Sequence, residues 1–149
     1  LYGGYTDFRV ETSDRPIFAT YRSRNCRNIR FWITVGGKKM PLEQTTHAEA
    51  RYNSGKRVYK LADNGWGKNK HLVLTVLAQP DTESVIWQFD SQGLPEDAML
   101  SCTVCDILHP DLKRGGDMNA DPADAFDPAP TETNKLTTEC YEVDFLNSS

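Results

Sequence analysis

Long apolar runs and the signature motifs of common enzymes are both missing from this sequence. Its longest apolar run, residues 72–78, is interrupted by Thr75 and is far shorter than the ~18 residues that span a bilayer. No G-x-S-x-G, H-E-x-x-H or phosphate-loop pattern occurs, so nothing points to a serine hydrolase, a zinc protease or a nucleotide-binding enzyme. No cofactor motif occurs either, and we expect no cofactor.

The N-terminus also lacks a visible signal peptide, because residues 1–5 contain neither a basic segment nor an apolar one. This leaves an intracellular protein or a mature secreted form whose signal has been removed, and a first residue of Leu favours the second. At 149 residues, with 38% hydrophobic and 26% charged residues, the composition is that of a globular protein. We therefore expect one domain over residues 1–149.

Strand signals are frequent and helix signals are few. Gly36-Gly37 predicts a tight hairpin turn, Asn64-Gly65 marks a second turn, and residues 71–79 are apolar on both faces, as in a central strand. The only helix signal is the capping-box spacing of Thr46 and Glu49. The expected strands cover residues 5–11, 17–22, 28–35, 38–42, 57–62, 71–79, 84–90, 99–108 and 136–146. This pattern predicts an all-β fold: an antiparallel β-sandwich or barrel of about 8–9 strands, with at most one short helix.

Residues 109–131 differ from the rest because proline, glycine and aspartate dominate them. We expect a long acidic surface loop there. Asp117, Asn119 and Asp121 place oxygen ligands at alternate positions, as a calcium loop does. However, Pro122 stands where an EF-hand needs glycine, so calcium is the weaker alternative to a solvated loop.

The four cysteines are an even number, as expected of a disulfide framework. A bridge between Cys102 and Cys105 would close a very short loop and gain little chain entropy. We therefore expect Cys26 to pair with one of them and Cys140 with the other, in an extracellular protein. Cys102, Cys105 and His109 also have the spacing of a partial zinc site, but a structural zinc needs four ligands.

Charge is divided along the chain. Residues 1–80 hold fourteen Lys and Arg against six Asp and Glu, giving +8, whereas residues 81–149 hold three against fifteen, giving −12. Gathered on one face, the basic residues would attract phosphates, sulfated glycans or an acidic protein. Alternatively, strands from the two halves interleave and neutralise each other. The net acidity disfavours a nucleic-acid partner.

Two sets of residues are candidates for function. Trp66 lies between two glycines, so it is either an exposed binding platform or a lid on the core. With it we group the neighbouring basic and aromatic side chains as binding candidates: Arg57, Tyr59, Lys68 and Lys70. The catalytic candidates would share one face only if residues 47–51 form a strand, and they are His47, Glu49 and Arg51, with His71 as a further histidine.

In general character the chain is similar to small disulfide-containing proteins that microbes, including filamentous fungi, secrete to act on a host. Our first hypothesis is a secreted, non-enzymatic binding protein, such as a virulence effector, whose partner is a host protein or a glycan. The alternative is a small secreted hydrolase, ribonuclease-like, that uses His47 and Glu49.

Overall fold

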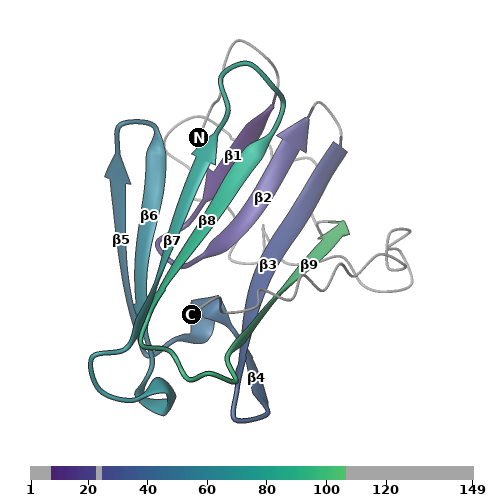
Figure 1. The fold of residues 1–149 in the computed structure, drawn as a ribbon. Coiled ribbons are helices and arrows are strands. Elements are labelled where there is room, and N and C mark those ends of the chain that lie inside the picture. The colour runs from purple at the N-terminus through teal and green to yellow at the C-terminus, as the bar shows by residue number, and fades with distance from the viewer. Residues whose placement is uncertain (1–7, 23–24, 107–149) are drawn as a thin grey trace.

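Nine β-strands in two antiparallel sheets make up the described part of the chain (Figure 1). The computed structural model describes residues 8–22 and 25–106. The strands are β1 (Arg9–Thr12), β2 (Ile17–Arg22), β3 (Asn25–Val35), β4 (Lys38–Pro41), β5 (His47–Asn53), β6 (Lys56–Ala62), β7 (His71–Ala78), β8 (Val85–Gln92) and β9 (Met99–Asp106). The predicted all-β sandwich is therefore confirmed. No helix among the described residues is long and apolar enough to cross a membrane.

The first sheet is built around the long strand β3. β2 pairs with the N-terminal half of β3 and β4 with its C-terminal half, while β9 pairs along the opposite edge and β1 extends the sheet beyond β2. The predicted hairpin between β3 and β4 is confirmed. Gly36 and Gly37 have φ values of 58° and 73°, the left-handed conformations that a two-residue hairpin turn requires.

The second sheet is a simple meander in the order β5-β6-β7-β8. Leu72, Leu74 and Val76 on β7 are buried, while the residues between them are half-buried on the outer face. This alternation follows from the two-residue period of a strand. The strand lies between β6 and β8, so the prediction of a central strand is confirmed.

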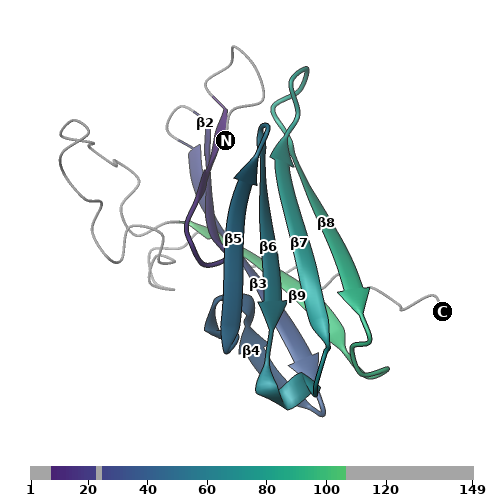
Figure 2. The same ribbon diagram turned by 90° about the vertical axis from the view of Figure 1, so that its left-hand side faces the viewer.

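Aromatic side chains fill the space between the two sheets. Phe18 contacts Tyr59 and Trp87 with ring centroids 5.6 and 4.6 Å apart, and Phe31 contacts Trp87 and Phe89, both at 5.0 Å. Figure 2 shows the strands β5–β8 in front of β2, β3 and β9. Edge-to-face pairs of this kind add to the free energy gained by burying the rings.

The predicted helix at residues 46–49 is wrong, because β5 begins at His47. Thr46 does not form a capping box with Glu49. Instead, its backbone N–H and its hydroxyl donate to Asp63 Oδ2 at 3.0 and 2.7 Å. These two long-range hydrogen bonds satisfy the backbone N–H and the hydroxyl of Thr46, and residues 47–53 pair with β6. The helical turns that the structure describes are two short 3₁₀ segments, η1 (Leu42–Gln44) and η2 (Asn64–Trp66).

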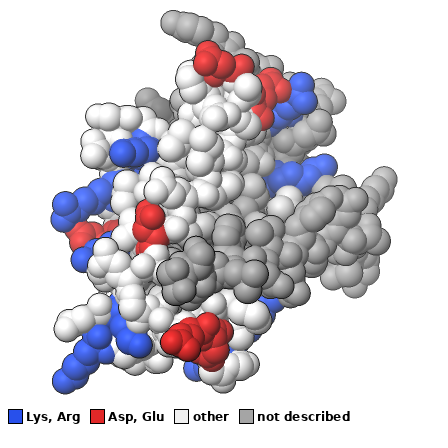
Figure 3. Space-filling model, viewed as in Figure 1, with Lys and Arg blue, Asp and Glu red and all other residues white. Residues whose placement is uncertain are grey.

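Charges of both signs are scattered over the face drawn in Figure 3, mostly towards its margins, and they form no single basic patch there. Several basic side chains of the first half are paired with acids. Arg30 contacts Glu43 at 2.8 Å, and Arg22 contacts Glu83, from the acidic half of the chain, at 2.5 Å. The Arg22–Glu83 pair thus joins the basic and acidic halves of the chain. The predicted loop 109–131 and the predicted strand 136–146 lie outside the described residues.

Candidate functional site

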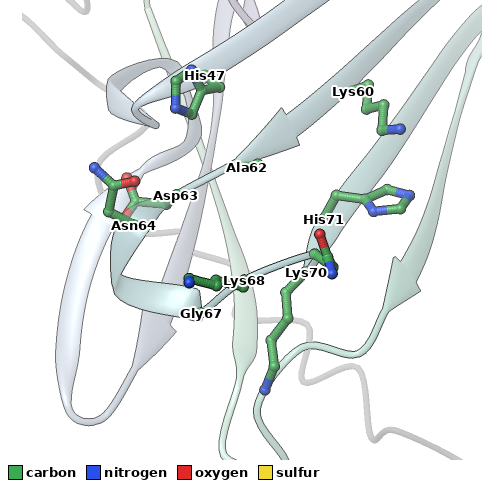
Figure 4. Close-up of a pocket in the computed structure, with 10 residues that line it drawn as sticks. His47, Lys60, Ala62, Asp63, Asn64, Gly67, Lys68, Lys70 and His71 are labelled. Atoms are coloured by element: carbon green, nitrogen blue, oxygen red, sulfur yellow. The ribbon is translucent and has the colours of Figure 1, made fainter.

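An open pocket of about 650 Å³ lies on the outer face of the second sheet, beside η2 (Figure 4). Three strands build its sheet side. His47 on β5 and His71 on β7 flank Ala62 on β6, and the pairing register carries all three side chains on one face. Neighbouring strands lie about 4.8 Å apart, so the two histidine backbones are separated by roughly 10 Å. The small alanine between them leaves a hollow. The lining residues are His47, Lys60, Ala62, Asp63, Asn64, Gly67, Lys68, Asn69, Lys70 and His71.

Asp63 holds the walls of this pocket together. Its Oδ1 accepts a hydrogen bond from the Gly65 N–H at 2.8 Å, which caps η2, while its Oδ2 accepts the two bonds from Thr46. Partial burial by itself raises the pKa of Asp63, but the bonds from Gly65 and Thr46 outweigh it and hold the pKa below its ordinary value. Both carboxylate oxygens of Asp63 thus accept hydrogen bonds from neighbouring residues of the protein.

The remaining charge in the pocket is positive. Lys60 and Lys68 are exposed, and Figure 4 shows Lys60 beside His71. The Lys70 stem passes close to Gly67 and Gly93, 3.6 and 3.7 Å from where their Cβ atoms would lie, and its ammonium extends away from both histidines. Asn64 and Asn69 add amide groups at the rim. The pocket therefore offers several donors and an excess of cationic groups.

The structure gathers some of the predicted site residues and separates others. His47, His71, Lys68 and Lys70 all line the pocket. Because residues 47–53 form a strand, Glu49 and Arg51 share the outer face with His47, as the strand alternative requires.

Three of the predicted binding residues make structural contacts away from the pocket. Trp66 is only 3% exposed and belongs to the hydrophobic core, so it is the lid and not an exposed platform. Tyr59 is buried, and its hydroxyl donates to the Ser13 carbonyl at 2.6 Å; burial raises its pKa, although Arg57 opposes the shift. Arg57 donates to the same carbonyl and to Asp14 at 2.8 Å. Tyr59 and Arg57 therefore fasten the second sheet to the loop between β1 and β2.

Lys60 and Asp63 are the residues that sequence reasoning missed. Lys60 could have been found from the alternation of residues 57–62, which places it on the face opposite to Tyr59 and Leu61. Asp63 carries no comparable signal, because its main partner, Thr46, is 17 residues away.

A smaller hollow of about 260 Å³ lies between the sheets where β8 and β9 approach each other. It is lined mainly by apolar side chains, among them Phe31, Trp87 and Phe89. This hollow lies beside the hydrophobic core, and its lining offers few polar or titratable side chains.

Cys102 and Cys105 form no disulfide with each other, and the Cys26 side chain lies outside the described part of the chain. Cys102 and Cys105 are three residues apart on β9, so their side chains point to opposite faces and cannot bridge each other. Cys140 and the calcium candidates Asp117, Asn119 and Asp121 lie outside the described residues. Within residues 8–22 and 25–106, no group of three or more His, Cys, Asp or Glu side chains is placed to hold a metal ion.

Residues 25–145 match the model of a family described as a domain of unknown function, DUF4450. The chain belongs to the DUF4450 family. No curated protein and no solved structure matches it. The DUF4450 match includes the pocket but begins after β1 and β2, although Val10 and Phe18 on those strands are fully buried in the core. The folded unit therefore extends beyond the DUF4450 match at its N-terminal side.

Proposed function

We propose that this DUF4450 domain is a non-enzymatic binding module that holds an anionic group, a carboxylate, sulfate or phosphate, in the pocket beside η2. One observation carries the proposal. Lys60, Lys68 and two histidines line one hollow whose lining carboxylate, Asp63, already accepts three hydrogen bonds. A concave site with an excess of one sign of charge concentrates ligands of the opposite sign.

Calorimetric titration with sulfate, phosphate and glucuronate tests this proposal. Lys60→Gln removes one charge from the pocket, and its matched control is Lys56→Gln. Lys56 is exposed on the same face of the same strand, about 13 Å away at ~3.3 Å per residue. An exposed charge pair at contact is worth about 1 kcal/mol, so Lys60→Gln should weaken binding about fivefold. Lys56→Gln should leave the affinity unchanged. Absence of binding, or equal weakening by both variants, would contradict the proposal.

A ribonuclease-like hydrolase is the second candidate, because His47 and His71 face the same hollow with Lys60 between their strands. In such a reaction one histidine accepts the proton of the attacking 2′-hydroxyl, and the other protonates the departing 5′-oxygen. Lys60 would stabilise the charge on phosphorus. Purified protein that cleaves RNA, and loses this activity in both His47→Ala and His71→Ala, would establish the hydrolase and refute the non-enzymatic module.

We further propose that the protein works outside the cell, as a secreted microbial protein acting on a host glycan or protein, with its four cysteines oxidised. The opposite orientations of Cys102 and Cys105 favour bridges from each of them to the distant cysteines Cys26 and Cys140. Mass spectrometry without reduction should give about 4 Da less than the all-thiol mass, because each disulfide removes two hydrogens. An unshifted mass would refute the disulfides.

A further inference from the structure

A second hollow of about 310 Å³ adjoins the pocket on the same face of the sheet. It is lined by Glu49, Arg51, Val58, Lys60 and Val73. Lys60 lines both hollows, so the two lie side by side. Together they form a trough, which we define by the residues of these two linings.

The strand register gives the length of the trough. The outward side chains of the sheet beneath it form three successive rows across β5, β6 and β7: His47–Ala62–His71, then Glu49–Lys60–Val73, then Arg51–Val58, which ends beside Thr75 outside the two linings. Rows on one face are two residues apart, or about 6.7 Å, so the first and third lie roughly 13 Å apart. The residues of η2 extend the trough further at the first row. The trough is therefore longer than a single oxyanion such as sulfate or phosphate.

The two ends of the trough differ in chemistry. At the η2 end, Lys60, Lys68 and the histidines favour an anion. At the other end, Arg51 Nε donates to Glu49 Oε1 at 2.6 Å, and these side chains are 76% and 54% exposed. An exposed guanidinium–carboxylate pair keeps further donors and acceptors for hydroxyl groups.

The floor of that end is aliphatic, since Val58 and Val73 are half-buried there between the polar side chains. A ligand that fits the whole trough is long, carries an acidic group at one end, and presents hydroxyls around an apolar C–H surface at the other. Sugars linked in a chain have these properties.

We propose that the natural ligand of the pocket is an acidic glycan chain, lying along the trough with its carboxylate or sulfate group near Lys60 and a neighbouring sugar against Val58 and the Glu49–Arg51 pair. This inference rests on the proposed function and names its ligand class. A nucleic-acid strand fits less well, because its next phosphate would meet the Glu49 carboxylate and no Phe, Tyr or Trp lines the trough as a platform for a base.

The experiment compares ligands of different length on the full chain. Galacturonate is titrated against a trisaccharide that links galacturonate to two neutral sugars as the carboxylated probe, and an otherwise neutral trisaccharide with one sulfate group is the sulfated one. The longer chains should bind at least tenfold more tightly than galacturonate. Arg51→Ala should weaken the longer chains about fivefold and leave galacturonate unchanged, whereas Lys60→Gln should weaken all three. Lys56→Gln is again the control, and thermal melting checks that each variant is folded.

The outcomes separate the two proposals. Equal affinity for galacturonate and both longer chains, with Lys60→Gln weakening all of them, would refute the glycan chain and keep the anion site. No binding of any anion would refute both. Single-stranded RNA that binds more tightly than both glycans, and more tightly still to Glu49→Gln, would replace the glycan with nucleic acid.

Discussion

Substitution of Asp63 tests directly whether its hydrogen bonds stabilise the pocket. Asp63→Ala removes three hydrogen bonds at once, one from Gly65 and two from Thr46. Loss of an N-cap costs about 0.5–2 kcal/mol, and each net hydrogen bond contributes about 1 kcal/mol. Because these groups are partly open to water, we expect Asp63→Ala to lower the free energy of unfolding by about 2–3 kcal/mol at pH 7. For a chain of this size that corresponds to a fall of roughly 5–10 °C in melting temperature.

The same substitution has a pH signature. A carboxyl whose pKa falls on folding stabilises the folded state above the unfolded pKa of about 3.9, and this contribution is lost as the pH falls through the folded value. The pKa of Asp63 is lowered in the fold because the bonds from Gly65 and Thr46 outweigh the effect of its partial burial. The stability difference between the natural chain and Asp63→Ala should therefore narrow as the pH falls below about 4.

Urea denaturation of both proteins between pH 7 and pH 3 measures the difference. Asp14→Ala is the matched control, because the Asp14 side chain is 99% exposed and makes one ion pair, with Arg57. Exposed pairs contribute little, so this control should change stability by about 0.5 kcal/mol or less. Equal destabilisation by the two variants, or a difference for Asp63→Ala that stays constant down to pH 3, would refute the reasoning.

Two further substitutions test how much Trp66 and Tyr59 contribute to the stability of the fold. Trp66→Ala should destabilise the fold by about 3–5 kcal/mol, since Trp66 is 3% exposed in the core; a loss below 1 kcal/mol in chemical denaturation would contradict its place as a lid. Tyr59→Phe should cost about 1 kcal/mol, because the Ser13 carbonyl keeps its bond from Arg57 when the hydroxyl is removed. Tyr52→Phe is the control for the second change, as Tyr52 is 65% exposed; equal costs for the two tyrosines would argue against the Tyr59 hydrogen bond.

Local patterns account for what could be predicted from the sequence. The turn at Gly36-Gly37 needs only its own two glycines, and β7 is recognisable because its apolar residues run through a segment of strand length. The prediction failed at Thr46, where a real local signal, the capping box, competed with a stronger partner. Asp63 lies 17 residues away, and nothing near Thr46 in the sequence indicates it.

Only part of the candidate site could be predicted, because its assembly also depends on contacts between residues far apart in the sequence. His47 and His71 were recognised as residue types, but their convergence on one pocket depends on how β5, β6 and β7 pair. Trp66 shows the opposite error. A tryptophan between two glycines has little local chain to cover it, and only the packing of the two sheets buries it.

The position of β9 also has a consequence for how the chain folds. The meander of β5–β8 joins strands that follow one another directly, so each hairpin can form as soon as its two strands are made. β3, in contrast, obtains its partner along one edge only after β9 has been synthesised, and the bond between Trp32 and Thr103 spans 71 residues. Pairings of such long sequence separation close slowly. On the ribosome, we therefore expect the four-stranded sheet to be complete first, while β3 exposes unpaired backbone N–H and C=O groups along one edge until β9 emerges to pair with them.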